Sequence, residues 1–349
     1  MFDFATFLAR VPEQTVLCIG DLMLDDFVYG EVSRISPEAP VPVIAVKREE
    51  KLIGGAGNVA CNVAGLGARC IFLGVVGEDE AGQILRAAFD RHAGLIEANL
   101  VVDPGRPTVR KLRFVSEHYS SHLLRADWEV AAPVPAEVES ALIERMQAAL
   151  PRAHAVVLSD YAKGTLTPRL IRMTIEGARR LGKVVVVDPK GLDFSIYRGA
   201  TLITPNRKEL GEASHRPVRD LAELDAAAAE LQRTVESDAV LVTLSEDGML
   251  LKIAGAESVH VPAYPVRVRD VSGAGDTVVA VLATLLAMNA GFEPAMRGAN
   301  AAASVVVGKR GTATVSAHEL RARILPAAAL ASEEKIVFDQ ALMDERVRE

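Results

Sequence analysis

The sequence is poor in the features that mark several classes of protein. Among 349 residues there are only three cysteines, Cys18, Cys61 and Cys70, and none has the CxxC spacing. An odd number of scattered cysteines fits neither a disulfide framework nor a zinc site and indicates a reduced compartment. No dense run of lysine and arginine occurs and the net charge is −7, which excludes the basic footprint of a nucleic-acid-binding protein. We expect the cysteines to be core residues.

Long apolar runs are also missing, so no segment reaches the length of about 20 residues that spans a membrane. The first residues, MFDFATFLARVPEQ, contain acids and only a short apolar stretch, which does not fit a secretory signal. Hydrophobic residues make up 50% of the chain and charged residues 24%, as in ordinary globular proteins. We therefore expect a folded cytoplasmic protein with one large α/β domain or two small ones.

Short apolar runs rich in β-branched residues alternate with alanine-rich helical stretches, and this rhythm predicts β-α units and a parallel sheet. Several runs lack alternation, as expected of strands buried on both faces. An amphipathic helix is predicted at 221–235 and a buried helix at 273–288. The predicted strands are 15–19, 70–76, 155–158, 184–187, 201–204 and 239–244.

Two segments, about 27–48 and 107–125, break this rhythm. The second contains the alternating sequence TVRKLRFV, which predicts exposed strands. We interpret both as a small β lid on a domain that covers residues 1–330, followed by a charged tail at 331–349. A small sheet with one apolar face and open edges needs a cover, and the lid of a second subunit would provide one. The sequence therefore predicts a homodimer that forms through the lid.

The segment DVSGAGDT, residues 270–277, directly precedes a strongly apolar helix. Its small residues let the backbone N–H groups of Gly273, Ala274 and Gly275 converge at a helix N-terminus, which favours a phosphate or a developing negative charge. Asp276 in the first turn has two interpretations. It either compensates the helix dipole or accepts a proton beside a transferred phosphoryl group.

This motif resembles the C-terminal signature of the ribokinase-like (PfkB) carbohydrate kinases, in which the last aspartate is the catalytic base. A second signature, GGAGNVACNVAGLGA at 54–68, stands where that family has its sugar-binding glycine pair. The resemblance implies an α/β, ribokinase-like fold with a central, mostly parallel sheet flanked by helices and a small β lid. It also implies an ATP-dependent sugar kinase with Asp276 as the base.

The resemblance assigns sugar binding to Asp25, Gly54, Gly55 and Asn58. The glycines would let the backbone approach the sugar, and Asn58 would donate to its hydroxyls. The alternative is a turn that opens a helix with an asparagine cap. Many family members have one residue more between the glycines and the asparagine. Loop capping is the alternative role for Asp25 and for its neighbours Asp21 and Asp26.

The segment TPNRKEL resembles the family's NxxE element, which places Asn206 and Glu209 near the ATP phosphates, with Glu209 acting indirectly on Mg²⁺. The same spacing also fits a helix cap followed by an acid. VTLSEDGMLL, residues 242–251, resembles the hairpin that holds Thr243 and Gly248 near the nucleotide. Asp270 matches a position that helps to hold K⁺ in some relatives.

Further segments resemble heptose 7-phosphate kinases: VSRISPEAPVPVIAV, RKLRFVSEHYSSHLLRAD, LSDYAKGTLT and VVDPKG. This resemblance implies phosphorylation of the anomeric hydroxyl of D-glycero-D-manno-heptose 7-phosphate, which gives the 1,7-bisphosphate used for ADP-heptose and lipopolysaccharide core synthesis. A substrate that already carries a phosphate needs cations, which Arg110, Lys111 and Arg113 would supply. Lys111 and Arg113 should share one face of the lid and Arg110 should lie on the other. A solubilising charged edge is the alternative.

Asp160, Lys163 and Lys190 follow apolar strands, at the sheet edge where open α/β proteins bind ligands. We assign Asp160 and Lys163 to the substrate and Lys190 to ATP. The alternative is that such strand-end residues are simply solvated.

Three other functions lack their motifs. No GxxxxGK[ST] sequence is present, no glycine fingerprint for a dinucleotide follows the first strand, and no HxGH motif of a nucleotidyltransferase occurs. We therefore expect the stand-alone kinase. The remaining alternatives are a related kinase that acts on fructose 1-phosphate, a tagatose phosphate, adenosine or ribose, and a sugar-binding regulator without turnover.

Overall fold

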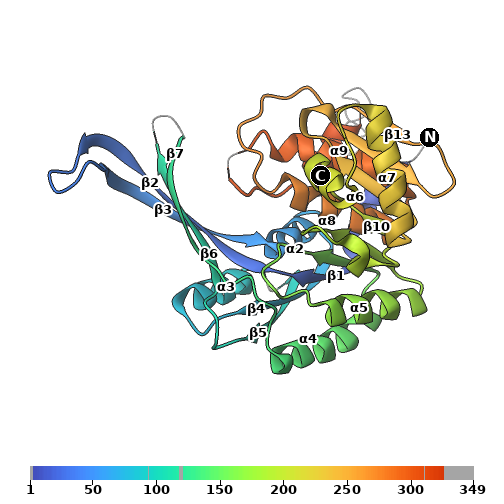
Figure 1. The fold of residues 1–349 in the computed structure, drawn as a ribbon, viewed down its shortest axis with the longest axis horizontal. Helices are drawn as coiled ribbons and strands as arrows, with labels where there is room; N and C mark the ends of the chain where they lie inside the picture. The colour runs from blue at the N-terminus through green and yellow to red at the C-terminus, as the bar shows by residue number, and fades with distance from the viewer. Residues whose placement is uncertain (1–2, 93, 118–120, 310, 326–349) are drawn as a thin grey trace, which may run out of the picture.

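The computed structural model describes residues 3–92, 94–117, 121–309 and 311–325, so the predicted tail at 331–349 lies outside the described residues. Within these ranges the body is built on a nine-stranded sheet (Figure 1) with the order β13-β12-β11-β10-β9-β8-β1-β4-β5. Its strands are β1 (Thr15–Gly20), β4 (Arg69–Val76), β5 (Ile96–Val102), β8 (Ala155–Ser159), β9 (Val184–Asp188), β10 (Leu202–Ile203), β11 (Ala239–Thr243), β12 (Met249–Ile253) and β13 (Val259–Val261). Neighbours from β11 to β5 are parallel, and β12 and β13 join as antiparallel strands.

Helices cover both faces of this sheet and bury a separate apolar core on each. One core contains side chains from α1 (Phe4–Ala9), α2 (Ala56–Gly65), α3 (Glu80–Asp90), α8 (Ala274–Leu286), α9 (Phe292–Val306) and α10 (Ala317–Ile324). The other contains side chains from α4 (Ala136–Ala149), α5 (Pro168–Arg180), α6 (Arg207–Ser214) and α7 (Leu221–Val235). Single 3-10 turns lie at η1 (Val11–Glu13), η2 (Leu150–Arg152), η3 (Phe194–Tyr197) and η4 (Ser245–Asp247).

The predicted parallel sheet is confirmed, and each predicted strand overlaps an observed one. The central strands β1, β8 and β11 are buried almost throughout, which explains why their sequences do not alternate. Helix α7 has the predicted bounds, and α8 begins one residue after Gly273. Cys18 and Cys70 are buried as expected, whereas Cys61 is only partly buried. No helix in the described ranges is both long enough and apolar enough to span a bilayer.

The predicted β lid is a four-stranded sheet with the order β3-β2-β6-β7. Its strands are β2 (Leu22–Ile35), β3 (Pro42–Gly55), β6 (Val109–Ser116) and β7 (Ser121–Trp128). The long β2–β3 hairpin projects from the body at the left of Figure 1. The lid reaches further back than predicted, because β2 already pairs with β3 at Leu22 and Gly55, beside the end of β1.

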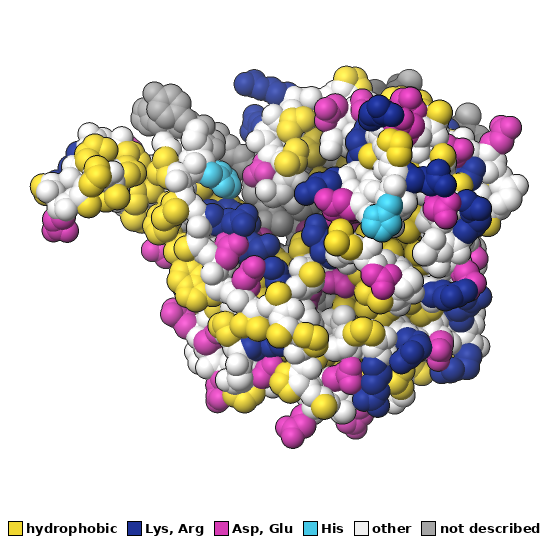
Figure 2. Space-filling view, in the orientation of Figure 1, with side chains coloured by type: hydrophobic (Ala, Val, Ile, Leu, Met, Phe, Trp, Pro, Cys, Tyr) yellow, Lys and Arg dark blue, Asp and Glu magenta, His cyan; other side chains and the backbone are white. Residues whose placement is uncertain are grey.

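The lid and the body differ in their surfaces (Figure 2). Hydrophobic side chains cover much of the projecting lid, and charged side chains of both signs gather where the lid meets the body. The exposed fractions of Ile35, Val41, Val46 and Leu124 are 62%, 51%, 52% and 61%. The lid therefore has an uncovered apolar surface of the kind that the sequence predicted.

Candidate active site

The N-terminus of α8 lies at the centre of the candidate site. Gly273 is the N-cap with a left-handed φ of 76°, and a Cβ atom there would lie 2.6 Å from Asn58 Nδ2, so only glycine fits. A Cβ on Gly275 would meet no atom within 4 Å, and Gly275 borders a cleft. The N–H of Ala274 donates to the Val271 carbonyl (3.2 Å), so it is already used within a turn. Of the predicted N–H groups, those of Gly273 and Gly275 fit an anion at this helix end better.

Asp276 is buried in the first turn of α8, with 4% of its surface exposed. Its Oδ2 accepts a hydrogen bond from Asn58 Nδ2 (2.7 Å), and its Oδ1 accepts one from the Tyr161 hydroxyl (2.6 Å). Burial raises the pKa of the carboxyl to about 6, against the lowering effect of these two donors. A carboxylate tuned in this way suits proton abstraction near neutral pH.

Asn58 lies in α2 and is part of a buried chain of amides. Its carbonyl oxygens, backbone and side chain, accept from Asn62 Nδ2 (3.0 and 3.3 Å), and Asn62 Oδ1 accepts from the Thr277 hydroxyl (2.9 Å). The helix cap is Gly55, so Asn58 is not the cap of the alternative interpretation. In this structure its side-chain N–H group holds Asp276 instead of facing an open space. The amide chain ties α2 to α8 and fixes the position of the carboxylate.

The two glycines at the end of β3 allow the lid to approach the site closely. Gly55 has a left-handed φ of 58°, and a Cβ atom there would lie 2.5 Å from the Asp21 carbonyl oxygen. A Cβ on Gly54 would lie 2.2 Å from Asp25 Oδ2. Any side chain at position 54 would therefore displace the Asp25 carboxylate.

The three aspartates after β1 have different roles. Asp21 caps a loop, because its carboxylate accepts from the backbone N–H groups of Tyr161, Lys163 and Thr165 at 2.9 to 3.0 Å. Asp25 and Asp26 belong to β2 and point to opposite faces of the lid. The loop-capping alternative thus describes Asp21 and not its two neighbours.

The lid cations separate as their alternation predicts. Arg113 donates to Asp25 Oδ1 (2.6 Å), and Lys111 Nζ lies 5.8 Å from the centre of the Tyr161 ring. Arg110 donates to Asp26 Oδ2 (2.6 Å) on the other face. Lys111 and Arg113 are therefore brought to the candidate site and Arg110 is not. Burial lowers the pKa of Lys111, against the attraction of Asp25.

A cleft of about 210 Å³ lies beside the first turns of α8, at the carboxyl ends of the parallel strands. Lys190 Nζ donates to Glu209 Oε1 (2.6 Å), and this bond raises the pKa of Lys190. Asn206 and Glu209 form a capping box at the start of α6, so the capping interpretation of this spacing is also present. The lining includes Asp160, Tyr161, Asp188, Lys190, Asn206, Glu209, Thr243 and Gly275.

Asp160 borders this cleft, and both oxygens of its carboxylate already accept hydrogen bonds from the protein. Its Oδ2 accepts from the Tyr197 hydroxyl (2.7 Å) and its Oδ1 from the N–H of Ala162 (2.7 Å). Burial raises the pKa of its carboxyl to about 6. Lys163 is directed elsewhere and pairs with Glu129 (2.8 Å).

Gly248 and Asp270 also lie away from this cleft. Gly248, with a φ of 90°, is in the turn between β11 and β12, where a Cβ atom would lie 2.0 Å from the Val261 carbonyl oxygen. Asp270 accepts from the N–H groups of Ser272 (2.9 Å) and Gly311 (3.0 Å) and borders a separate hollow beneath the lid.

Sequence reasoning missed Tyr161 and Asp188. Tyr161 stands between the predicted residues Asp160 and Lys163, and Asp188 precedes Lys190 by two positions. Burial raises the pKa of Asp188, and the nearby Asp276 and Glu209 add to this effect. The signal was the position of each residue at the carboxyl end of a buried strand, since Asp188 ends β9 and Tyr161 follows the end of β8 by two positions.

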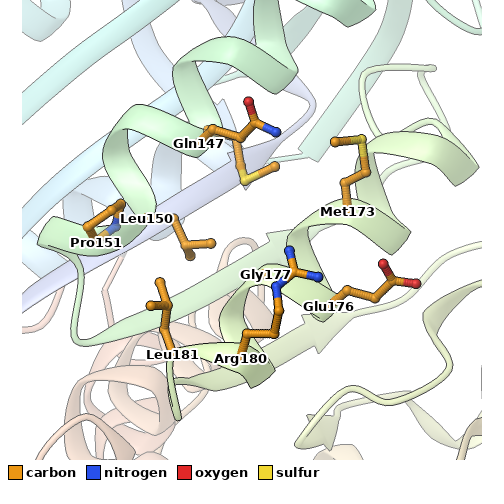
Figure 3. A pocket seen from close by; sticks show the side chains of 9 residues that line it. Gln147, Leu150, Pro151, Met173, Glu176, Gly177, Arg180 and Leu181 are labelled. Carbon is orange, nitrogen blue, oxygen red and sulfur yellow. The ribbon is translucent and has the colours of Figure 1, made fainter.

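A further hollow, shown in Figure 3, lies between α4 and α5 and contains none of the candidate residues. Met146, Leu150 and Met173 give it apolar walls, and Glu176 and Arg180 lie at its edge. It belongs to the opposite face of the sheet from α2 and α8.

Comparisons with known proteins show the family of this chain. The model of the pfkB family of carbohydrate kinases matches residues 13–319. The bifunctional protein HldE of Rhodopseudomonas palustris strain BisA53 is 60% identical over 97% of this chain and 69% of its own length. The HldE protein of Bradyrhizobium diazoefficiens is 58% identical over the whole chain and 70% of its own length.

Solved structures show the same fold. Arabidopsis thaliana ribokinase, complexed with ribose and ATP, has a TM-score of 0.69 at 21% identity, covering 90% of this chain and 99% of its own. Escherichia coli phosphofructokinase-2 with fructose-6-phosphate has a TM-score of 0.71 at 22% identity, covering 88% and 96%. The expected ribokinase-like fold is thus confirmed, and the family match covers the residues that carry the site. The chain belongs to the pfkB family of carbohydrate kinases.

Proposed function

We propose that this kinase transfers the γ-phosphoryl group of ATP to the anomeric hydroxyl of D-glycero-D-manno-heptose 7-phosphate, with Asp276 as the general base. The observation that carries the proposal is the position of Asp276. On one side lies the cleft with Lys190 and Glu209, and on the other lies the base of the lid with Asp25 and Lys111, close enough for both charges to affect the Asp276 pKa. One tuned carboxylate at the junction of two binding regions suits phosphoryl transfer between two substrates.

The residues that line the cleft suit the binding of a nucleoside triphosphate. Lys190 offers a cation, and we propose that it binds ATP phosphate oxygens together with Asn206 and Thr243, which are bridged to each other as neighbouring backbone segments. Gly248 would act only by shaping the turn beside Thr243. In the substrate-bound enzyme, the hydrogen bond from Lys190 to Glu209 would be replaced by one from Lys190 to a phosphate oxygen.

The residues present fit Mg²⁺ as a metal held mostly by phosphate and water. No group of three or more acidic, histidine or cysteine side chains suited to a metal occurs among the described residues. Glu209 Oε2 already accepts from the Asn206 N–H (3.0 Å) and Oε1 from Lys190. Glu209 would therefore act on the metal through water, which agrees with the way Mg²⁺ retains its waters. When bound, the metal neutralises charge on the phosphates.

The proposed proton transfer uses this chain's own groups. The anomeric O–H gives its proton to Asp276 while its oxygen attacks the γ-phosphorus, and the bond from that phosphorus to the ADP oxygen breaks. The N–H groups of Gly273 and Gly275 face the charge that develops on the transferred group. Asn58 holds Asp276 in position throughout.

Sugar binding is proposed for the region between the lid and α2. Asp25 and the backbone at Gly54 and Gly55 would contact hydroxyl groups. Asp160 would do so from the body, whereas Lys163 would have to leave Glu129 first. Lys111 and Arg113 would meet the phosphate that the substrate already carries, and Arg110 would act only by holding Asp26.

Three further parts of the proposal concern the setting of the enzyme. We propose that it works in the cytoplasm, which suits its three free cysteines. We also propose that Asp270 helps to hold K⁺, because its carboxylate lies beside the backbone at Ser272 and Gly311. The exposed apolar side chains of the lid support a homodimer formed through the lid.

One experiment tests the reaction as a whole. The protein is incubated with Mg-ATP and a panel of sugar phosphates, and phosphorus NMR locates the new phosphate. We expect one new signal from an anomeric phosphate on the heptose. Transfer to fructose 1-phosphate, a tagatose phosphate, adenosine or ribose would replace the substrate assignment. If no sugar of the panel supports ATP consumption, the sugar-binding regulator without turnover would be favoured instead.

A further inference from the structure

Both oxygens of Asp276 accept hydrogen bonds from neighbouring side chains. Oδ2 is bound by Asn58, which is itself fixed by Asn62 and has 1% of its surface exposed. Oδ1 is bound by Tyr161, which borders the cleft. Because Asn58 is locked within α2 and Tyr161 lies at the edge of an open space, Oδ1 is the oxygen that an incoming hydroxyl can reach.

The position of Tyr161 is fixed by hydrogen bonds between its loop and Asp21. Its backbone N–H donates to Asp21 Oδ2 (2.9 Å), and the same carboxylate holds the N–H groups of Lys163 and Thr165. Asp21 is 1% exposed, so the loop after β8 is anchored in the core. Burial raises the pKa of the Tyr161 phenol, and the neighbouring Asp276 adds to this, so the phenol keeps its proton and acts as a donor. The second donor on the base is therefore built into the fold.

A base whose second oxygen were free would bind water. A water molecule on Oδ1, close to the γ-phosphate position, could lose a proton to Asp276 while its oxygen attacks phosphorus and the bond to ADP breaks. The products would be ADP and inorganic phosphate, and Asp276 would return its proton to solvent. Kinases lose ATP unproductively by this route. A group that keeps water away from Oδ1 would therefore reduce ATP hydrolysis.

We infer that Tyr161 determines the specificity of transfer for sugar over water: its hydroxyl occupies Oδ1 of Asp276 until a sugar hydroxyl displaces it. A bound sugar can displace the phenol because its other hydroxyls gain contacts with Asp25 and with the backbone at Gly54 and Gly55. Water has no such additional contacts. This inference rests on the proposed role of Asp276 as the base.

The test is Tyr161→Phe, which keeps the ring and removes only the hydroxyl. Hydrolysis of Mg-ATP is measured without sugar, and transfer is measured with D-glycero-D-manno-heptose 7-phosphate. We expect the ratio of hydrolysis to transfer to rise about tenfold, the effect of losing one hydrogen bond to a charged group. Tyr264→Phe is the matched control, because Tyr264 packs its ring under Arg323 and should leave the ratio unchanged.

Two further variants separate this inference from the proposed function. Adding Asp276→Asn to Tyr161→Phe should remove the extra hydrolysis, since that hydrolysis needs the base. If Asp276→Asn alone abolishes transfer but Tyr161→Phe lowers hydrolysis and transfer equally, Tyr161 is only structural and the inference is overturned. If Asp276→Asn retains transfer, the proposed base itself is wrong. A folding defect in Tyr161→Phe would lower both activities, so a rise in hydrolysis cannot be explained by damage.

Discussion

The body and the lid contribute to the candidate site in different ways. On the body side, Asp276 and Asp160 are buried, and donors from neighbouring elements hold each carboxylate in one place. On the lid side, charged groups hold each other: Arg113 pairs with Asp25, and Arg110 pairs with Asp26. The body therefore supplies groups that are already in position for chemistry, and the lid supplies charges that can exchange partners when a substrate arrives.

This comparison predicts that substitutions in the body reduce turnover and that substitutions in the lid change substrate binding. A static carboxylate that accepts a proton acts in the transition state and appears in kcat. A cation that grips a remote phosphate acts equally in the ground and transition states and appears in KM.

The largest effect is expected for Asp276→Asn. The amide cannot accept the proton of the acceptor hydroxyl, so kcat should fall about a hundred- to ten-thousand-fold. ATP binding measured by calorimetry should stay close to that of the unmodified enzyme, because the cleft with Lys190 and Glu209 is untouched. Turnover near the normal rate would refute the role of Asp276 and remove the basis of the comparison.

Next is the response of the lid to Lys111→Ala and Arg113→Ala. If these cations bind the phosphate of the substrate, KM should rise about ten- to hundredfold for the heptose 7-phosphate and much less for the unphosphorylated heptose. Lys111→Ala is the cleaner variant, because removing Arg113 leaves the buried Asp25 unpaired and also costs stability.

Lys51→Ala is the control for the lid variants. Lys51 pairs across the sheet with Asp26 and so lies on the face away from Asp25. Its KM for both sugars should not change. Equal increases for the two sugars in Lys111→Ala would show that Lys111 does not recognise the phosphate. A fall in kcat alone would place Lys111 with the catalytic groups of the body.

The pH dependence of kcat tests the tuning of the base. Asp276 must be ionised to accept a proton, and burial raises its pKa to about 6. The rate should therefore be level above this pH and fall about tenfold for each unit below it. The measurement is kcat with saturating substrates over the range in which the protein stays folded. A rate that stays level down to about pH 4, the ordinary range of a carboxyl group, would contradict the tuning.

The sequence predicted most of the framework because the information is local. Apolar runs predicted the parallel strands, and the spacing of Asn206 and Glu209 predicted a helix cap, which occurs as a capping box at the start of α6. Alternation in β6 correctly separated Arg110 from Lys111 and Arg113. Each of these patterns is decided by residues a few positions apart.

The remaining features of the site depend on contacts between distant segments. Tyr161 and Asp276 are 115 positions apart and Asn58 and Asp276 are 218 apart, and they meet only because the loop after β8 and helix α2 both pack at the start of α8. Sequence reasoning assigned Asn58 to the sugar. The hydrogen bond from Asn58 to Asp276 could not be predicted, because it depends on how α2 packs against α8. The pairing of Asp25 with Arg113 likewise follows from β2 lying beside β6.

A smaller effect is expected for Glu209→Gln. If Glu209 organises the metal through water, the Mg²⁺ concentration needed for half-maximal activity should rise several-fold, since one of few carboxylates near the phosphates is lost. Glu212→Gln on the same helix is the control, because Glu212 pairs with Lys208 at 3.6 Å. An unchanged Mg²⁺ titration for Glu209→Gln would leave it with only its structural role in the capping box.

The last prediction concerns the outer surface of the lid and should leave chemistry nearly unaffected. Ile35 and Leu124 are 62% and 61% exposed, so an aspartate in place of either should introduce charge into an apolar dimer contact. Sedimentation at micromolar concentration should show a dimer for the unmodified protein and monomer for Ile35→Asp and Leu124→Asp. Leu192→Asp is the control. Leu192 is 65% exposed and lies on the body, so this variant introduces the same charge outside the lid. If the variants remain dimeric while Leu192→Asp dissociates, the body forms the contact and the lid serves the substrate alone. A monomeric unmodified protein would mean that the apolar lid surface has another partner.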